Sequence, residues 1–291
     1  YTPGTHQLFS HVAKDTKSRE VLSLQVAKDM LCLIDFFANK APHNERDCYK
    51  AMVRIFNEQC EVKQDQITIR KHTGGNVMQN TSDPDATFDG HKGPGYQVQL
   101  SETCSEKNEI QLITCAIPQT ACVADSESAR EVLDNLQSHG LLPQEMVADT
   151  AYTNDENVLY AQQMGVDLVG PTVVNPQDNK DPYEELSVDD FSTDPVSKTV
   201  VCCPAGHKPQ HSEYDSKSDK TTVIMPASAC GNCEFFGKCP AGKVKGQYRV
   251  EYTGKQRRMA ERRREQVTDV YKERYKIRGG IEATNSGLKR R

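Results

Sequence analysis

The sequence contains 291 residues, of which 36% are hydrophobic and 26% are charged, with a formal net charge of −5 at pH 7. That length is sufficient for one large domain or two smaller ones. No apolar run reaches the roughly 18 residues that a membrane-spanning helix requires, and no signal peptide opens the chain, so we expect a cytoplasmic protein without membrane contacts.

Charge is distributed unevenly along the chain. Residues 241–291 contain 16 Lys or Arg and 6 Asp or Glu, whereas residues 1–240 contain 20 basic and 35 acidic residues. A basic tail on an acidic body indicates a C-terminal region that meets nucleic acid through salt-dependent phosphate contacts. The alternative is a charged surface helix, because Glu261 interrupts the cations of residues 255–264.

The first 94 residues divide into a helical segment and a polar segment. Residues 21–39 and 47–60 each carry an apolar stripe, so residues 1–62 are predicted to be helical. Residues 63–94 are polar and rich in turn-forming Gly, Pro and Asp, which predicts a linker.

Residues 95–170 have the pattern of an α/β core. Alternating and apolar runs predict strands, and longer amphipathic segments predict helices. The expected order is a strand at 96–100, a strand at 110–117, a helix at 125–140 with Ser126 as its candidate cap, a strand at 145–149, a helix at 154–165 and a strand at 166–169. Two antiparallel strands followed by a helix, a strand, a helix and a strand fit part of a ribonuclease H-like (RNase H-like) mixed sheet.

Residues 171–250 interrupt this core with a cysteine-rich segment. Short alternating runs within it predict a small β-rich insertion of the zinc-ribbon kind. A Cys-x2-Cys pair lets two thiolates bind one tetrahedral ion from a tight turn, and two further cysteines would complete a closed structural zinc site. Reduced thiols without metal are the alternative. The candidate ligands are Cys203, Cys230, Cys233 and Cys239, with Cys202 and His207 as substitutes.

Two carboxylates are candidates for binding a divalent cation. Asp149 ends the predicted strand at 145–149, and Glu282 lies in residues 251–291, which are predicted to be basic and helical. At about 3.6 residues per turn, Arg278, Glu282 and Lys289 fall near one face of such a helix. Carboxylates from a strand end and a packed helix can hold two Mg²⁺ or Mn²⁺ ions about 3.5–4 Å apart. The alternatives are a strand-end cap for Asp149 and a solvated basic helix for the C-terminal segment.

The spacing Tyr275-x2-Arg278-x3-Glu282-x6-Lys289 resembles the signature around the catalytic glutamate of DDE transposases from bacterial insertion sequences. The resemblance continues in residues 82–100, 148–152 and 280–290 and covers nearly the whole chain. It points to the branch with a cysteine-rich insertion before the last catalytic glutamate. It implies an RNase H-like fold, a Mg²⁺ requirement, and cut-and-paste cleavage and transfer of DNA strands at element ends.

The same resemblance implies roles for individual residues. Asp149 would be the second acid of the catalytic triad and Glu282 the third, while Tyr275, Arg278 and Lys289 would contact DNA near the cleaved end. Terminal inverted repeats and target DNA would be the partners, and the full-length protein would act as a homodimer on DNA of the bacterial nucleoid.

In this family the first catalytic aspartate lies before the strand at 96–100. We expect it upstream of Tyr1, so the chain is expected to be a fragment whose sheet lacks its first strand and which is inactive by itself. Asp83, Asp85 and Asp89 are alternative sources, although their Pro- and Gly-bearing setting favours a loop. The competing hypotheses are a non-catalytic DNA- or zinc-binding remnant of a transposable element and an unrelated RNase H-like nuclease.

Overall fold

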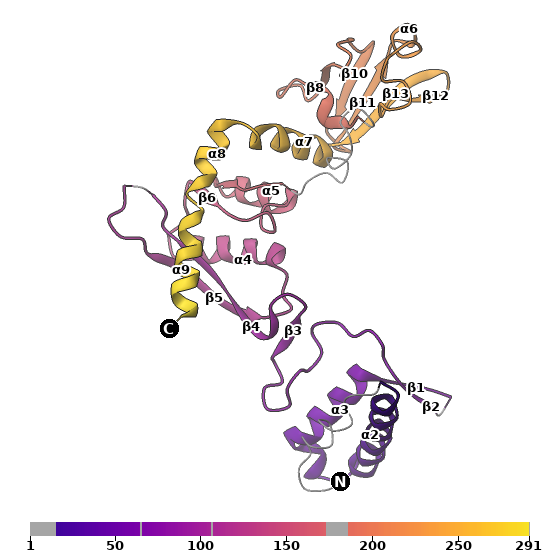
Figure 1. Cartoon of the computed structure of the whole chain (residues 1–291), viewed down its shortest axis with the longest axis vertical. Helices are drawn as coiled ribbons and strands as arrows, with labels where there is room; N and C mark the ends of the chain where they lie inside the picture. The colour runs from indigo at the N-terminus through magenta and orange to yellow at the C-terminus, as the bar shows by residue number, and fades with distance from the viewer. Residues whose placement is uncertain (1–15, 65, 106, 173–185, 291) are drawn as a thin grey trace. The chain divides into compact units, whose positions relative to one another are not determined.

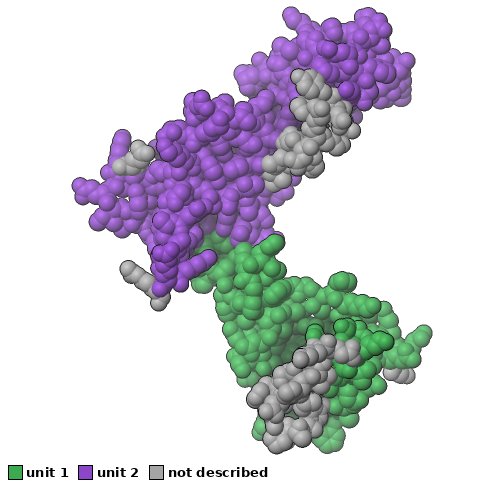
Figure 2. All heavy atoms as spheres, viewed as in Figure 1, with its two compact units in different colours: residues 1–99, 116–123 green, residues 100–115, 124–291 purple. Residues whose placement is uncertain are grey.

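The structure, a computed structural model, describes residues 16–64, 66–105, 107–172 and 186–290, and it combines helices with several small sheets (Figure 1). The expectation of a mixed α/β fold is confirmed. The chain forms two compact units, Tyr1–Gln99 with Ala116–Val123 and Leu100–Cys115 with Ala124–Arg291 (Figure 2). Within the described ranges, no helix has the length and apolar character needed to cross a membrane.

The first unit begins with two helices packed on a hairpin. Its core is small, because only Ala27, Phe56 and Cys60 are fully buried in this cluster, with partly buried Leu31 and Ile67 against them. Both helices predicted from the apolar stripes are present. The elements are α2 (Thr16–Phe37), η1 (His43–Glu45), α3 (Asp47–Gln59), and the antiparallel strands β1 (Cys60–Lys63) and β2 (Gln66–Ile69).

Residues 63–94, expected to be a linker, contain strand β2 and the edge strand of a second sheet. That sheet has the order β3-β4-β5, formed by β3 (Thr87–Asp89), β4 (Gly93–Glu102) and β5 (Ile113–Thr120). Asp89 accepts hydrogen bonds from the backbone N–H groups of His91 and Lys92, both at 2.8 Å, and so closes the β3–β4 turn. The polar composition therefore reflects tight turns between short strands, not an absence of strands.

The second unit contains the β-α-β part of the predicted core. The elements are α4 (Asp125–Ser138), β6 (Glu145–Val147), α5 (Asp155–Gln163) and β7 (Asp167–Val169), with β6 and β7 parallel. Leu133 on α4, Val158 and Ala161 on α5, and Leu168 on β7 form its buried cluster. All six predicted strands and helices of residues 95–170 are present. The described strands, however, form a β3-β4-β5 sheet and a separate β6–β7 pair, and no single mixed sheet joins them.

The N-terminal cap predicted for α4 is absent, whereas α5 has a side-chain cap. The side chain of Asn154 accepts a hydrogen bond from the backbone N–H of Asn157 at 2.9 Å and caps α5. The α4 helix begins after Ala124 without a side-chain cap, and Ser126 lies inside its first turn. Asp125 and Glu127 in that turn compensate electrostatically, because negative side chains are favourable at a helix N-terminus.

The predicted β-rich insertion is present as a four-stranded antiparallel sheet with a strand pair. Phe191, Val223, Met225 and Val250 are almost completely buried and form its core. The sheet order is β10-β11-β13-β12. The elements are η3 (Val188–Asp190), β8 (Ser192–Thr193), β9 (Val200–Cys202), β10 (His211–Asp215), β11 (Lys220–Met225), α6 (Ala227–Cys230), β12 (Gly242–Val244) and β13 (Gln247–Thr253).

The basic C-terminal region is helical, as predicted, but it is broken into three helices. They are α7 (Gly254–Gln266), α8 (Asp269–Lys276) and α9 (Gly279–Lys289). Thr253 and Gln256 form a reciprocal capping box at the start of α7. Helix α7 ends at Gln266, and Thr268 caps α8 by accepting a hydrogen bond from the backbone N–H of Tyr271.

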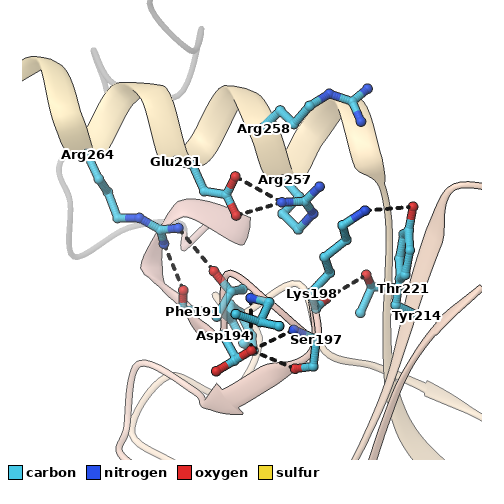
Figure 3. A network of polar contacts seen from close by, with 12 residues as sticks. Phe191, Asp194, Ser197, Lys198, Tyr214, Thr221, Arg257, Arg258, Glu261 and Arg264 are labelled. Carbon is cyan, nitrogen blue, oxygen red and sulfur yellow. Dashed lines mark hydrogen bonds and ion pairs between the residues drawn. The ribbon is translucent and has the colours of Figure 1, made fainter. Parts of the chain in front are cut away.

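The arginines of α7 hold the β-rich insertion and the β-α-β core together. Arg258 binds both carboxylate oxygens of Asp155 at 2.9 Å and contacts Asp219 at 3.0 Å. Arg262 donates to the carbonyl oxygens of Thr153 and Gly170. Figure 3 shows Arg264 reaching from α7 to the carbonyl of Phe191, and Arg257 facing Glu261 on the same helix.

Replacing Arg258 by alanine should destabilise the fold. Asp155 is only 5% exposed, so its carboxylate would lose its bidentate partner without gaining water. We expect the free energy of unfolding in urea at neutral pH to fall by about 2–4 kcal/mol. Lys255→Ala, at an exposed position of the same helix, should change it by less than about 0.5 kcal/mol. Equal effects of the two substitutions would contradict this role for Arg258.

Candidate active site

Asp149 lies at the carboxyl end of β6 and is fixed by its backbone. The N–H of Ala148 donates to the carbonyl of Val169 at 2.8 Å, which extends the parallel pairing to the residue before Asp149. Its Oδ1 atom accepts a hydrogen bond from the backbone N–H of Thr150 at 2.8 Å. The side chain is 51% exposed. Asp149 is therefore a rigidly placed, solvent-accessible carboxylate, with Oδ2 directed away from its own turn.

Glu282 reaches the same place from the first turn of α9. Arg278, the residue that precedes this helix, joins the two carboxylates. Its Nη2 lies 3.0 Å from Asp149 Oδ2, and its Nη1 lies 2.8 Å from Glu282 Oε1. The structure thus brings together two of the acids and one of the cations that sequence analysis singled out. A guanidinium suits this position because its two N–H arms can bind separate carboxylates at once.

Helix α9 is positioned mainly by polar contacts. None of its described residues is buried. On one face, the hydroxyl of Thr284 donates to Glu102 Oε2 at 2.6 Å, and Glu102 is the last residue of β4. Just before the helix, Arg278 binds Asp149, and it also binds Glu282 in the first turn. Two separate anchors therefore set the rotation of α9 about its axis and, with it, the direction of the Glu282 side chain.

Sequence analysis did not identify Glu102. The strand was predicted to end at residue 100, whereas β4 continues to Glu102. A carboxylate at a strand end is the same signal that led to Asp149. Extending the strand by two residues would have placed Glu102 among the candidates. Its partner Thr284 carries no comparable signal in the sequence.

Tyr275 packs against the neighbouring turn of α8. Its ring stacks on that of Tyr271, with centroids 5.9 Å apart and planes inclined by 13°. Burial raises the pKa of Tyr275, and the positive charge of Arg278 acts in the opposite direction. Lys289 is exposed in the last turn of α9, two helical turns after Glu282 and near the same face. Of the three predicted DNA contacts, Arg278 lies between the carboxylates, while Tyr275 and Lys289 flank them along the chain.

Most arginines of the basic region already have partners within the protein. On α7 they contact acidic side chains or backbone carbonyls, and on α8 Arg274 binds Glu145 and Asp167 at the starts of β6 and β7. Their charge is therefore used in folding, and the charge count of this region overstates the cations available to a nucleic acid. The arginines concerned are Arg257, Arg258, Arg262, Arg263, Arg264, Arg274 and Arg278. The exposed cations of the last two helices are Lys272, Lys276, Lys289 and Arg290.

Two of the three aspartates considered as substitutes for the first acid, Asp83 and Asp89, have local structural partners. Asp83 accepts a hydrogen bond from the hydroxyl of Tyr96 at 2.7 Å. This hydrogen bond raises the pKa of Tyr96 to about 12. Asp89 closes the β3–β4 turn. Both belong to the first unit, whereas Asp149 and Glu282 belong to the second. Asp83 and Asp85 lie outside the named strands, as the loop interpretation expects, whereas Asp89 is the last residue of β3.

The four predicted zinc ligands line one cavity of about 30 Å³ in the β-rich insertion. Cys230 ends α6, and Cys233 follows it in a turn closed by a hydrogen bond from its N–H to the carbonyl of Cys230. Cys203 is brought in by a second turn, in which its N–H donates to the carbonyl of His207 at 3.0 Å. Cys239 completes the set. Of the substitutes, His207 also lines the cavity, whereas Cys202 belongs to β9 and does not.

The cavity thiols are close enough to affect one another's charge. Burial raises the pKa of Cys230, and negative charge on the other three cysteines raises it further. Burial likewise raises the pKa of Cys239, with smaller contributions from Cys203 and Cys233. All four are free cysteines. Nevertheless, nowhere in the described ranges do three or more His, Cys, Asp or Glu side chains converge closely enough to hold a metal ion.

The metal-free protein should become less stable at alkaline pH. Burial raises the pKa of Tyr271 to about 12, and the pKa values of Cys230 and Cys239 are also raised. The folded state therefore holds these protons more tightly than the unfolded state. This contribution is complete below the unfolded pKa values of about 8.5 for Cys and 10 for Tyr, and it is lost as pH rises through the folded values. Urea unfolding with a chelator should show a decline in unfolding free energy that begins near pH 9.

Tyr271→Phe is the control for this decline. The Tyr271 hydroxyl is buried without a hydrogen-bond partner among the described residues, so its removal should cost little stability at neutral pH. The variant should lose stability less steeply above about pH 10 than the wild-type chain. An unchanged slope would show that Tyr271 does not contribute.

Comparisons with models of protein families, with curated proteins and with solved structures find no match for this chain. The resemblance to DDE transposases therefore depends on the sequence patterns of residues 82–100, 148–152 and 275–290, and family membership stays a prediction.

Proposed function

We propose that the chain carries two acids of the active site of a DDE-type DNA transposase, which cleaves DNA at the ends of an insertion sequence and transfers the strands to a target. The observation that supports this most directly is the Asp149–Arg278–Glu282 contact. Two exposed carboxylates that are far apart in sequence bind the same guanidinium. One comes from a strand end and the other from a helix, as predicted from the sequence.

The order of elements supports an RNase H-like interpretation of the core. The neighbouring strands β4 and β5 are followed by α4 and then by the parallel β6–α5–β7 unit. Asp149 follows β6, and ligand sites in α/β folds are commonly found beyond the carboxyl ends of strands. In sequence, the β-rich insertion lies between β7 and α7, so Glu282 comes after the insertion.

The donor set suits Mg²⁺ or Mn²⁺, which prefer oxygen ligands and commonly bind through one or two carboxylates plus water. When bound, such ions would activate a water molecule or a 3′-hydroxyl and stabilise the leaving oxygen. Asp149 is held in place by the N–H of Thr150, and the Glu102–Thr284 hydrogen bond fixes the helix that carries Glu282. Tyr275, Arg278 and Lys289 would hold the DNA near these acids, and two copies of the protein would each present such a site.

We further propose a structural zinc ion in the β-rich insertion. Four sulfur donors surround one cavity, and two of them come from a tight Cys-x2-Cys turn. Zinc lies about 2.3 Å from each sulfur, so a small cavity is sufficient. Four thiolates repel one another without a cation between them, and zinc binding would remove this repulsion and draw the side chains inward. Arg264 on α7 ties this insertion to the rest of the unit by donating to the carbonyl oxygens of Asp189 and Phe191.

The second candidate function is a DNA- or zinc-binding remnant without catalysis. It is favoured by the number of carboxylates at the candidate active site, because two acids meet at Arg278 where a DDE site needs three. The two candidate functions assign different roles to the carboxylate of Asp149. In a transposase it binds metal, whereas in a remnant it only forms an ion pair with Arg278.

Asp149→Asn tests the proposed active site. Loss of the charged oxygen should weaken Mn²⁺ binding by at least about tenfold in calorimetry, because a hard cation depends on ionised carboxylates. Affinity for a DNA duplex measured without divalent metal should not fall, since positive side chains make the phosphate contacts. Asp269→Asn, at a fully exposed aspartate on α8, is the matched control and should bind Mn²⁺ like the wild type. Unchanged Mn²⁺ binding by Asp149→Asn would favour the remnant.

Cys233→Ser tests the zinc proposal. The variant should lose bound zinc on dialysis, measured by atomic absorption, because one of four thiolates is removed. Cys202→Ser is the matched control: Cys202 is adjacent to Cys203 in sequence but does not line the cavity. Its zinc content should equal that of the wild type. Zinc absent from the wild-type chain, or equally retained by both variants, would refute the site.

A further inference from the structure

The guanidinium of Arg278 occupies the place of a cation between the two site acids. Asp149 has two carboxylate oxygens, and both are engaged: Oδ1 accepts from the N–H of Thr150, and Oδ2 binds Arg278. A divalent ion that binds Oδ2 would lie about 2.1 Å from it. The positively charged guanidinium cannot remain on the same oxygen at 3.0 Å without strong repulsion. Metal binding and the Arg278–Asp149 contact therefore compete.

We propose that Arg278 is shared between two ligands: it neutralises Asp149 and Glu282 when no metal is present, and it passes to a DNA phosphate when a divalent ion takes its place. Metal and DNA then bind cooperatively through a single side chain. This inference rests on the proposed function of the same site. The inference adds cooperativity between the binding of the divalent ion and the binding of DNA. Neither the acids alone nor the basic residues alone would produce this cooperativity.

The position of Arg278 permits this exchange. The residue lies at the junction between α8 and α9, and its side chain is 26% exposed. The contacts to Asp149 and Glu282 are made by the guanidinium alone, so rotation of the side chain can break them without unwinding either helix. The hydrogen bond from Thr284 to Glu102 is independent of Arg278 and continues to anchor α9. A freed guanidinium presents paired donors that match a phosphate group.

Arg274 provides a matched comparison within the same region. It lies one helical turn before Arg278, is 30% exposed, and also binds two acids of the core, Glu145 and Asp167. Those acids lie at the starts of β6 and β7, whereas Asp149 follows the carboxyl end of β6. The two arginines thus have similar exposure and similar ion pairs, but only Arg278 contacts the proposed metal ligands.

Metal binding and DNA binding are thermodynamically linked through Arg278. If metal binding releases Arg278 for DNA, DNA binding must also release the acids for metal, and the two effects on affinity must be equal. The cost of removing Arg278 is modest, because ion pairs between half-exposed groups are weak. We expect DNA to raise the Mn²⁺ affinity of the wild-type chain by about fivefold or more, and Mn²⁺ to raise its DNA affinity by the same factor.

The experiment measures Mn²⁺ binding by the 291-residue chain with and without a short DNA duplex at low ionic strength, corrected for Mn²⁺ bound by DNA alone. Three proteins are compared: wild type, Arg278→Gln and Arg274→Gln. Without DNA, Arg278→Gln should bind Mn²⁺ about threefold to tenfold more tightly than the wild type, because no guanidinium competes. The coupling between DNA and Mn²⁺ should nearly vanish in this variant. Arg274→Gln should retain both wild-type values.

The outcomes separate this inference from the function on which it rests. Mn²⁺ binding that depends on Asp149, with the same affinity and the same coupling in Arg278→Gln and wild type, would overturn the shared role of Arg278 and leave the metal site in place. Failure of both the wild type and Arg278→Gln to bind Mn²⁺ would overturn the metal site and the coupling together. Loss of coupling in Arg274→Gln as well as Arg278→Gln would also overturn the inference, because a general loss of positive charge would then explain it.

Discussion

The ion pair between Arg278 and Asp149 is the contact on which the candidate active site depends, because it joins chain segments that the β-rich insertion separates in sequence. Arg278 also binds Glu282, four residues later. Helix α9 buries none of its described side chains, so the hydrophobic effect contributes little to its placement. Its orientation depends instead on directional polar contacts at Arg278 and Thr284. Such contacts are individually weak in water, and a site built on them can reorganise when a ligand competes for one partner.

The β-rich insertion and the core are joined by a different use of positive charge. The arginines of α7 bind an almost buried carboxylate at Asp155 and several backbone carbonyls, including those of Thr153 and Gly170. The guanidinium of Arg262 is partly withdrawn from water, and this burial lowers its pKa. Arginine suits such contacts because its charge is delocalised and weakly hydrated. The basic C-terminal region therefore serves partly as structural support.

The cysteine cavity illustrates how a donor set can be present before a metal site is formed. Two turns, one after β9 and one after α6, bring sulfur atoms from separate parts of the insertion to the same small space. Burial and mutual repulsion favour the neutral thiols of Cys230 and Cys239. At the proposed zinc site, metal binding would therefore be coupled to deprotonation of these thiols.

Sequence by itself determined the local structure and the identities of the candidate residues. Periodicity located the strands and helices of residues 95–170, and spacing singled out the Cys-x2-Cys turn, Asp149 and Glu282, because these signals extend over only a few neighbouring residues. Tertiary structure decided what those residues contact. It assigned the α7 arginines to internal carboxylates and carbonyls, placed Glu102 against Thr284, and set Arg278 between the two acids. Such pairings join residues far apart in the chain, and they depend on packing geometry that no local pattern encodes.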